Sequence, residues 1–315
     1  AAAAALACAA SAPRAQPAPA GETAIFYYPW YSTPARDGRW AHWYVERSGT
    51  PVLAIAFYPL RGLYSSSDPR IVAAHMREIA AAGIDTVVVS WWGPGSVEDE
   101  RLPLVQAAAR REGLRVALHL EPYAGRTPER AVADVERLRA FGIRDVYVYD
   151  ADRDAPAAWA AALSRLQGVR VFAHTTLVGR ARAAGFDGVY TYDVAIWTGR
   201  TFRRLCAQAR AAGLLCAPSV GPGYDARLAT GHALVRPRQN GRVYDGMWRA
   251  ALRAGADVVT ITSYNEWQEG TQLEPARPQV GRPGYEGAWG RTGVAAARAY
   301  LEATARWTTR LRQGR

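Results

Sequence analysis

Eight short runs of apolar, β-branched or aromatic residues alternate along this sequence with longer segments rich in Ala, Leu and Arg. Runs that are apolar throughout are typical of strands covered on both faces, as in a parallel sheet wrapped by helices. The predicted strands lie at residues 24–31, 85–92, 115–123, 145–150, 169–175, 187–194, 214–221 and 257–267. Repeated strand–helix units of this kind predict an α/β fold, a single (β/α)8 TIM barrel with long strand-to-helix loops.

The segments between the strands carry the signals that start and stop helices. Residues 68–83 begin with Asp and Pro, residues 127–142 begin with Thr and Pro, and both end in Gly. The main alternative, a doubly wound open sheet, would carry a glycine-rich phosphate-binding turn after its first strand. Residues 27–34, YYPWYSTP, do not resemble such a turn. The longest stretches outside the pattern, residues 32–67 and 221–245, have the length of functional loops.

One domain, residues 23–312, accounts for the whole pattern, because no second domain or linker is evident in the sequence. Residues 1–22 are rich in Ala and Pro, and we expect a disordered leader or the remnant of an export signal. Cys8 follows small apolar residues, which makes it a candidate lipid-bearing residue of a lipoprotein. We therefore expect an exported protein, extracellular or anchored at the cell surface, with no membrane span.

The cysteines, the histidines and the net charge limit which cofactors and macromolecular partners the sequence predicts. Cys206 and Cys216 could form a disulfide in an exported protein or remain two buried thiols. No Cys or His pairs recur at ligand spacing, so we expect no metal and no other cofactor. The formal net charge is +11, but the arginines are dispersed along predicted helix faces, so we expect no nucleic-acid partner. We also expect a monomer.

Aromatic and acidic residues gather where the predicted strands end, which is where barrel enzymes place their active sites. Core packing alone would explain large aromatic residues, but not why aromatics and carboxylates share the same end of the strands. Flat rings stack on the C–H faces of sugars, and acidic groups bind hydroxyls, so the set favours a carbohydrate site. The residues that we expect at this site are Tyr28, Trp91, Trp92, Glu121, His174, Tyr190, Tyr192, Asn265, Glu266, Trp267 and Glu269.

Glu266 and Glu269 follow the last predicted strand with only two residues between them. Cleavage of a glycosidic bond needs one protonated carboxyl to assist the leaving oxygen and one ionised carboxylate to act as base or nucleophile. Two carboxyls held close together have pKa values that are pushed apart, which suits these two roles. Each glutamate could instead form a surface salt bridge with one of the many arginines. Their shared place at a strand end favours the catalytic interpretation.

Two longer segments carry a family resemblance. FYYPWYSTPARDGRWAHW, residues 26–43, and TSYNEWQEGTQLEPA, residues 262–276, resemble glycoside hydrolase family 99, the endo-α-mannosidases. Between them VVVSWWGPG, LHLEPY, VYVYD, DGVYTYD and PGYD occur in the order that the family has. The resemblance covers roughly residues 24–300 and implies a (β/α)8 barrel that cleaves within α-mannose-containing oligosaccharides or polysaccharides.

The resemblance also implies roles for individual residues. The family retains the anomeric configuration without an enzymic nucleophile, because the 2-hydroxyl of the substrate attacks C1. Glu266 would be the base that deprotonates this hydroxyl, and Glu269 the acid that protonates the leaving oxygen and later activates water. Glu121 would bind substrate. Beside the attacked sugar would lie a tyrosine of FYYPWY such as Tyr28, with Tyr190 or Tyr192, and Trp91 or Trp92 would stack on the next sugar.

Three positions depart from the family pattern. Gln268 stands where the family has His, Ala151 and Asp152 replace Ser-Tyr, and Asp193 replaces an aromatic residue. These changes leave open which glycan is the substrate and whether Gln268 alters the preference. Two alternatives also remain open at this point. One is a non-catalytic glycan-binding barrel at the cell surface, and the other is a hydrolase of another α-linked polysaccharide.

Overall fold

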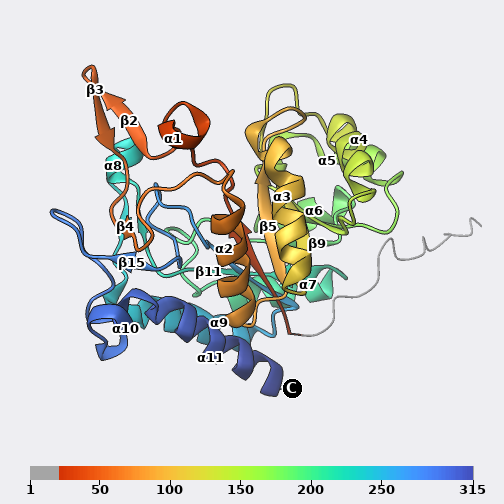
Figure 1. Ribbon diagram of the computed structural model, residues 1–315. Helices are drawn as coiled ribbons and strands as arrows, with labels where there is room; N and C mark the ends of the chain where they lie inside the picture. The colour runs from red at the N-terminus through yellow and green to blue at the C-terminus, as the bar shows by residue number, and fades with distance from the viewer. Residues whose placement is uncertain (1–20, 315) are drawn as a thin grey trace, which may run out of the picture.

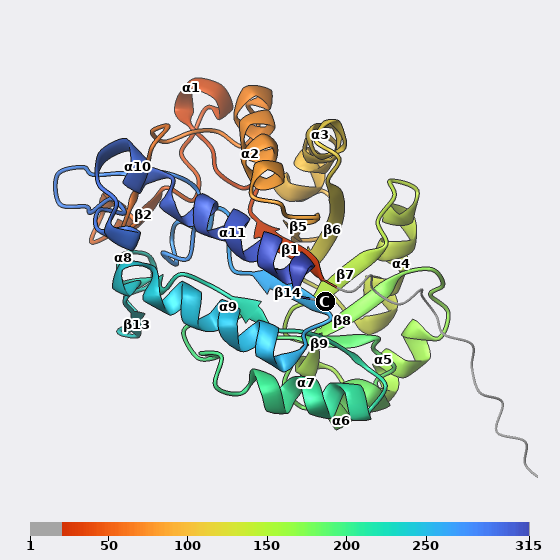
Figure 2. The ribbon, with the colours of Figure 1, turned by 90° about the horizontal axis from the view of Figure 1, so that it is seen from below.

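The computed structural model of the protein describes residues 21–314, which form a ring of parallel strands surrounded by helices (Figures 1 and 2). The main sheet has the order β10-β9-β8-β7-β6-β5-β1-β14-β11, and every neighbouring pair in it is parallel. Its strands are β1 (Glu22–Tyr27), β5 (Thr86–Trp91), β6 (Arg115–Leu120), β7 (Asp145–Val148), β8 (Arg170–His174), β9 (Gly188–Tyr190), β10 (Leu215–Ala217), β11 (Ser219–Val220) and β14 (Val258–Ile261). The predicted (β/α)8 barrel is confirmed.

The seventh predicted strand, residues 214–221, is interrupted at Pro218, which has no N–H to donate to a neighbouring strand. The segment before it, β10, pairs with β9, and the segment after it, β11, pairs with β14. Because β10 and β11 are successive pieces of one run, this change of partner closes the ring.

Each of the eight predicted runs contains a strand, but several strands are shorter than predicted at their carboxyl ends. The first ends at Tyr27 rather than at residue 31, and the last ends at Ile261 rather than at residue 267. The residues beyond these ends have the aromatic composition of a strand but bond to loops instead. For example, the Tyr28 N–H donates to Asn265 Oδ1 at 2.8 Å. The sequence pattern therefore locates the strands better than it locates their ends.

Helices cover the outside of the barrel (Figure 2). Both helices predicted from capping signals are confirmed, since Asp68 caps α2 by accepting a hydrogen bond from the Arg70 N–H and Thr127 caps α4 in the same way. The α-helices are α1 (Pro34–Asp37), α2 (Pro69–Ala81), α3 (Val97–Arg111), α4 (Pro128–Arg139), α5 (Pro156–Leu163), α6 (Val178–Ala183), α7 (Phe202–Ala211), α8 (Arg227–Thr230), α9 (Arg242–Ala254), α10 (Gly293–Ala297) and α11 (Ala299–Gln313).

The two long excursions predicted at residues 32–67 and 221–245 lie beyond the carboxyl ends of β1 and β11. They carry small antiparallel pairs, and Arg47 Nη2 joins them by donating to the backbone carbonyls of Arg227 and Leu228. In Figure 1 the β2–β3 hairpin and α8 lie next to each other at the upper left. The short strands and turns are β2 (Tyr44–Arg47), β3 (Thr50–Leu53), β4 (Tyr58–Pro59), β12 (Tyr224–Asp225), β13 (Val235–Arg236), β15 (Ala276–Arg277), η1 (Ala151–Arg153), η2 (Gln239–Gly241) and η3 (Ala288–Gly290).

The barrel interior is a packed core. Arg170 closes the end where the strands begin, because its guanidinium lies 2.5 Å from Asp145 Oδ1 and 3.1 Å from Glu22 Oε2. Aromatic rings fill the middle, with the Tyr147 and Phe172 centroids 4.7 Å apart. The carboxyl ends of the strands are therefore the end of the barrel that can receive a ligand.

Some predictions concern residues outside 21–314, the range that the structure describes. Cys8 and the leader up to residue 20 lie outside the described residues, whereas Glu22 already begins β1. Within residues 21–314, none of the helices has the length and apolar character that a bilayer-spanning helix requires.

Cys206 of α7 and Cys216 of β10 form a disulfide, so of the two alternatives for these residues the structure contains the bonded one. The bridge joins a helix to the strand that follows it, across a sequence separation of 10 residues.

We expect Cys206→Ser with Cys216→Ser to lower the free energy of unfolding by roughly 2–3 kcal/mol, because the reduced chain gains loop entropy when unfolded. Urea unfolding under oxidising conditions measures the loss. Dithiothreitol should destabilise the native protein by a similar amount and leave the double variant unchanged. Equal sensitivity of both proteins to the reductant would contradict this account.

Candidate active site

Two glutamates meet other acidic and aromatic side chains at the carboxyl end of the barrel. Glu266 and Glu269 lie in the loop after β14, residues 262–275, which is called the catalytic loop below. Glu121 follows β6 directly, and Asp193 follows β9. The charges of Glu121 and Asp193 raise the pKa of Glu269, so residues distant in sequence share one site.

The catalytic loop is closed on itself by backbone hydrogen bonds. The Ser263 N–H donates to the Thr271 carbonyl at 3.1 Å, and the Glu274 N–H donates to the Tyr264 carbonyl at 2.8 Å. Within the loop, the Glu266 N–H donates to Ser263 Oγ at 2.8 Å. These bonds hold the backbone that carries both glutamates in one conformation.

Burial is the largest influence on both catalytic-loop carboxyls. Glu266 is almost fully buried, and burial followed by the charge of Glu269 raises its pKa well above the ordinary value. Two backbone N–H groups, those of Gln268 and Glu269, act in the opposite direction by favouring the ionised form of Glu266. Glu269 is partly exposed, and burial, Asp193 and Glu121 raise its pKa to about 8. The pair can therefore hold a proton at neutral pH.

Tyr28 and Tyr192 lie beside these carboxylates and are hydrogen-bonded to each other through their hydroxyls. Burial, followed by the charges of Glu121, Glu266 and Glu269, raises the pKa of Tyr28 well above its ordinary value. The pKa of Tyr192 is raised by the same kind of surroundings. Both hydroxyls therefore remain protonated, and because one donates to the other, the pair keeps one O–H for donation to a ligand.

Glu121 is held by one hydrogen bond and lies close to a histidine ring. Ser90 Oγ donates to its Oε1 at 2.8 Å, and His119 Nδ1 lies 2.9 Å from the same oxygen. The second ring nitrogen of His119, Nε2, lies 2.9 Å from the hydroxyl of Tyr190, which is fully buried. Of the two predicted tyrosines, Tyr192 is therefore the one that the structure places among the catalytic-loop carboxylates, and Tyr190 supports Glu121 from behind.

The two predicted stacking tryptophans differ in exposure. Trp91 is 0% exposed, and its indole N–H donates to Asp99 Oδ1 at 2.9 Å. Trp92 is 39% exposed. Of the two, Trp92 presents a ring surface to solvent where a sugar could stack.

Asn265 and Trp267 were expected to contact substrate, but both side chains are fully buried. The Asn265 amide clamps the backbone of Tyr28, accepting from its N–H at 2.8 Å and donating to its carbonyl at 2.9 Å. The Trp267 indole N–H donates to Glu274 Oε2 at 2.8 Å. Direct contact with substrate does not fit these positions, because neither side chain has an open face.

His174 lies at the rim, with Nε2 3.1 Å from Asp193 Oδ2 and its ring stacked on Tyr149 at 4.6 Å. Asp193, Tyr149 and Tyr224 were not among the predicted site residues. The pKa of Tyr224 is raised to about 12 by burial and then by Glu269 and Asp193, which places its ring beside the acidic cluster. Tyr149 and Asp193 lie at the ends of predicted strands and Tyr224 follows one, so applying the strand-end rule to every strand would have included them.

A cavity of about 410 Å³ adjoins the catalytic loop, and Tyr224 and Gly270 are among the residues that line it. The Asp225 N–H donates to the Glu269 carbonyl at 2.7 Å, which joins the wall of this cavity to the loop. Within residues 21–314, no group of three or more His, Cys, Asp or Glu side chains could hold a metal ion.

Comparison with known proteins yields consistent matches. The sequence profile of glycosyl hydrolase family 99 matches residues 20–313. The glycoprotein endo-alpha-1,2-mannosidase-like protein of Danio rerio is 31% identical, over 81% of this chain and 71% of its own length. The glycoprotein endo-alpha-1,2-mannosidase of Mus musculus is 29% identical, over 81% of this chain and 68% of its own. The solved GH99 endo-alpha-mannosidase of Bacteroides thetaiotaomicron superposes with a TM-score of 0.83 at 30% identity, covering 94% of this chain and 98% of that one.

We expect Asp193→Asn to lower the pKa of Glu269 from its value of about 8, because the Asp193 charge disfavours ionisation of that carboxyl. Carboxyl ¹³C NMR titration of protein labelled at glutamate measures the change, with Glu269→Gln identifying the resonance. Asp152→Asn is the matched control, since this carboxylate is held by Thr175 and Arg180. An unchanged Glu269 titration in Asp193→Asn would contradict the assigned charge coupling.

Proposed function

The chain belongs to glycosyl hydrolase family 99 and is a mannoside-cleaving glycosidase, and from this premise we propose that it is an endo-acting hydrolase of α-1,2-mannose-containing glycans. We propose further that it retains the anomeric configuration through participation of the substrate 2-hydroxyl. The observation that supports this most directly is the pair of carboxyls with raised pKa values on one rigid loop, Glu266 and Glu269.

The environments of the two carboxyls support different roles. Glu269 has a pKa of about 8, so it is protonated at neutral pH and suits the general acid. Glu266 receives backbone N–H groups that favour its ionised form, which suits the base. Because burial and the charge of Glu269 also raise the pKa of Glu266 well above its ordinary value, the assignment of base to Glu266 and acid to Glu269 follows their places in the family motif.

In the proposed first step two protons are transferred while one bond to C1 forms and another bond to C1 breaks. Glu266 accepts the proton of the 2-hydroxyl while O2 forms a bond to C1. The bond from C1 to the leaving oxygen breaks at the same time, and Glu269 gives its proton to that oxygen. The products of this step are the released glycan and a 1,2-anhydro sugar, with Glu266 protonated and Glu269 ionised.

The second step restores the enzyme. Glu269 accepts a proton from water as the water oxygen bonds to C1 and the C1–O2 bond breaks, and Glu266 returns its proton to O2. Each step inverts C1, so the two together retain the configuration. Because the substrate supplies its own nucleophile, the protein needs only a base and an acid at this site.

Other residues of the site support binding of the sugar. Glu121 presents a carboxylate that can accept hydrogen bonds from hydroxyls, and the hydrogen-bonded pair of Tyr28 and Tyr192 has one O–H left to donate. Trp92 offers an exposed ring for stacking on a neighbouring sugar. His174 and Asp193 form a polar rim, and Asp193 is one of the positions that depart from the family pattern.

Two of the departures have structural consequences that bear on the choice of glycan. Asp152 is taken up by Arg180 Nε at 2.9 Å and by Thr175 Oγ1 at 2.6 Å, so its carboxylate is already satisfied at the rim. Gln268 is partly exposed, and its N–H donates to Glu266 Oε1 at 3.2 Å. An effect of Gln268 on substrate preference therefore stays a prediction about its side chain.

Export, monomeric state and lipid attachment at Cys8 remain proposals. The Cys206–Cys216 disulfide supports export, because such bonds form and persist in oxidising compartments. A secreted or surface-anchored hydrolase would meet polysaccharide outside the cell.

We expect Glu266→Gln and Glu269→Gln each to lower kcat on α-mannan by about 10²–10⁴-fold, which is the usual contribution of a general base or acid. Reducing ends released per enzyme measure kcat, and thermal melting shows that the variants are folded. Near-normal turnover in either folded variant would remove that residue from its proposed role.

A substrate that lacks the 2-hydroxyl on the attacked sugar should not be cleaved, because no atom is then available to displace the leaving group. The test compares an α-mannoside with its 2-deoxy analogue and follows the first-formed anomer by ¹H NMR. We expect an α product from the mannoside and none from the analogue. Cleavage of the analogue, or a β product, would indicate a different mechanism.

A further inference from the structure

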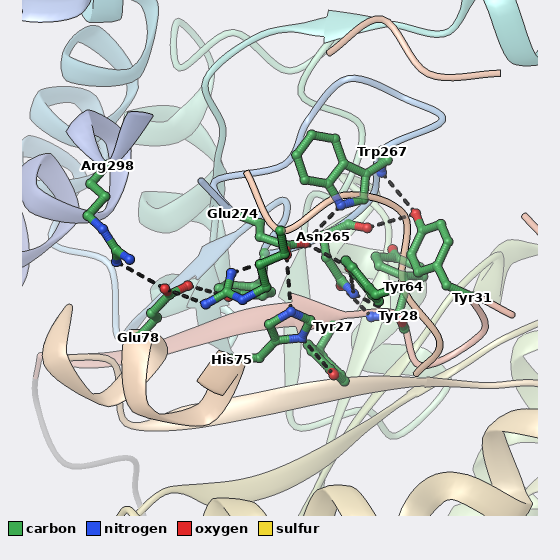
Figure 3. Close-up of polar contacts among 12 residues, drawn as sticks. Tyr27, Tyr28, Tyr31, Tyr64, His75, Glu78, Asn265, Trp267, Glu274 and Arg298 are labelled. Carbon is green, nitrogen blue, oxygen red and sulfur yellow. Dashed lines mark hydrogen bonds and ion pairs between the residues drawn. The ribbon is translucent and has the colours of Figure 1, made fainter. Parts of the chain in front are cut away.

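Glu274 is a third acidic residue of the catalytic loop, and the proposed reaction does not use it. Its side chain is 0% exposed, yet its two oxygens have four polar neighbours from three parts of the chain (Figure 3). These neighbours are Tyr64 Oη at 2.7 Å, Trp267 Nε1 at 2.8 Å, His75 Nε2 at 3.1 Å and Arg61 Nη1 at 3.4 Å.

A buried carboxylate is costly unless other groups compensate its charge. Burial alone would raise the pKa of Glu274, but His75, Arg61 and Tyr64 together hold it below the ordinary value, so the group stays ionised. Arg61 is itself fixed by Glu78, 2.5 Å away, and Glu78 also receives Arg298 at 3.0 Å. A series of ion pairs therefore extends from the surface, through Glu78 and Arg61, to Glu274 in the catalytic loop.

The contact with Trp267 connects this buried charge to the catalytic base. Trp267 follows Glu266 directly in sequence and is held at two points. Its indole N–H donates to Glu274 Oε2 at 2.8 Å, and its backbone N–H donates to the Tyr31 hydroxyl at 3.0 Å.

The residue before Glu266 is fixed by the same tyrosine, because the Tyr31 hydroxyl donates to the Asn265 carbonyl at 2.8 Å. Glu266 therefore lies between two residues whose positions are set from outside the loop. If the Trp267 indole lost its acceptor, the peptide that follows Glu266 would keep its bond to the Tyr31 hydroxyl but lose the contact that fixes the Trp267 side chain.

We propose that Glu274 is a positioning residue of the proposed reaction, which holds the Trp267 indole and thereby sets the direction in which Glu266 presents its carboxyl to the substrate. This inference rests on the proposed role of Glu266 as base. A misplacement of about 1 Å at a reacting group can cost on the order of 10²-fold in rate. Loss of the indole contact is thus expected to appear in kcat rather than in substrate binding.

The structure offers a matched control, because Tyr64 donates to the same oxygen as Trp267. Both bonds end at Glu274 Oε2, but Tyr64 belongs to the excursion after β1 and not to the catalytic loop. The Tyr64 hydroxyl also accepts from the Asn265 amide nitrogen, but at 3.4 Å this bond contributes little. If Glu274 were important only for stability, losing either donor would have the same consequence.

The experiment replaces Trp267 with 3-benzothienylalanine, an isostere in which sulfur takes the place of the indole N–H, and compares it with Tyr64→Phe. Each change removes one donor to a charged group and should lower the melting temperature by a similar, small amount. Glu274→Asp is the third variant, because it keeps the charge opposite Arg61 but withdraws the oxygens by one methylene. Assays on α-mannan give kcat and KM for each folded variant.

We expect the Trp267 isostere and Glu274→Asp to lower kcat by about tenfold or more, with KM within about twofold of the native value. This pattern is the one expected when the lost hydrogen bond acts mainly in the transition state. Tyr64→Phe should keep its kcat within about twofold of native. The proposal is overturned if the isostere has native kcat, or if Tyr64→Phe loses as much kcat as the isostere. Failure of the proposed function is a separate outcome, because the native protein itself would then release no reducing ends.

Discussion

The burial of carboxylates in one short loop is the constraint on which the rest of this structure depends. Glu266 and Glu274 are nearly or fully buried, eight residues apart, and their pKa values move in opposite directions. Glu274 is surrounded by donors and stays ionised, whereas Glu266 faces the charges of Glu269 and Glu121. The protein thus compensates one charge completely so that the loop is rigid, and leaves the other partly uncompensated so that it can exchange a proton.

The barrel brings together, at one end, groups from segments that are far apart in the sequence. Strand β14 delivers the loop to the centre of the ring, and strands on both sides contribute groups that no single segment could supply. Tyr28 arrives from β1, Glu121 from β6 and Tyr192 from β9. The opposite end is closed by the ion pairs of Arg170 and the middle is filled by aromatic rings, so these groups meet at the carboxyl ends of the strands.

Sequence patterns identified the fold and the central pair of the candidate site, but not the orientation of neighbouring residues. Continuous apolar runs locate buried strands, and the spacing of Glu266 and Glu269 is local, so both could be predicted. The choice between Trp91 and Trp92 could not, because adjacent residues at a strand end point to opposite sides and either could face the core. For Asn265 and Trp267 the sequence pattern has a related limit, since polar and aromatic groups that hold a loop have the same composition as those that touch a ligand.

The sequence by itself determined that eight strand–helix units form a barrel and that two glutamates share the end of its last strand. Hydrophobic periodicity and short spacings are properties of the chain before it folds, and they need no partner to be recognised. Only the tertiary structure decided the charge states, because burial and the fields of Glu121, Asp193, His75 and Arg61 come from segments far away in sequence. It also decided that Glu274 is an ionised anchor rather than a third group at the cleft, since its four polar neighbours meet only when the barrel closes.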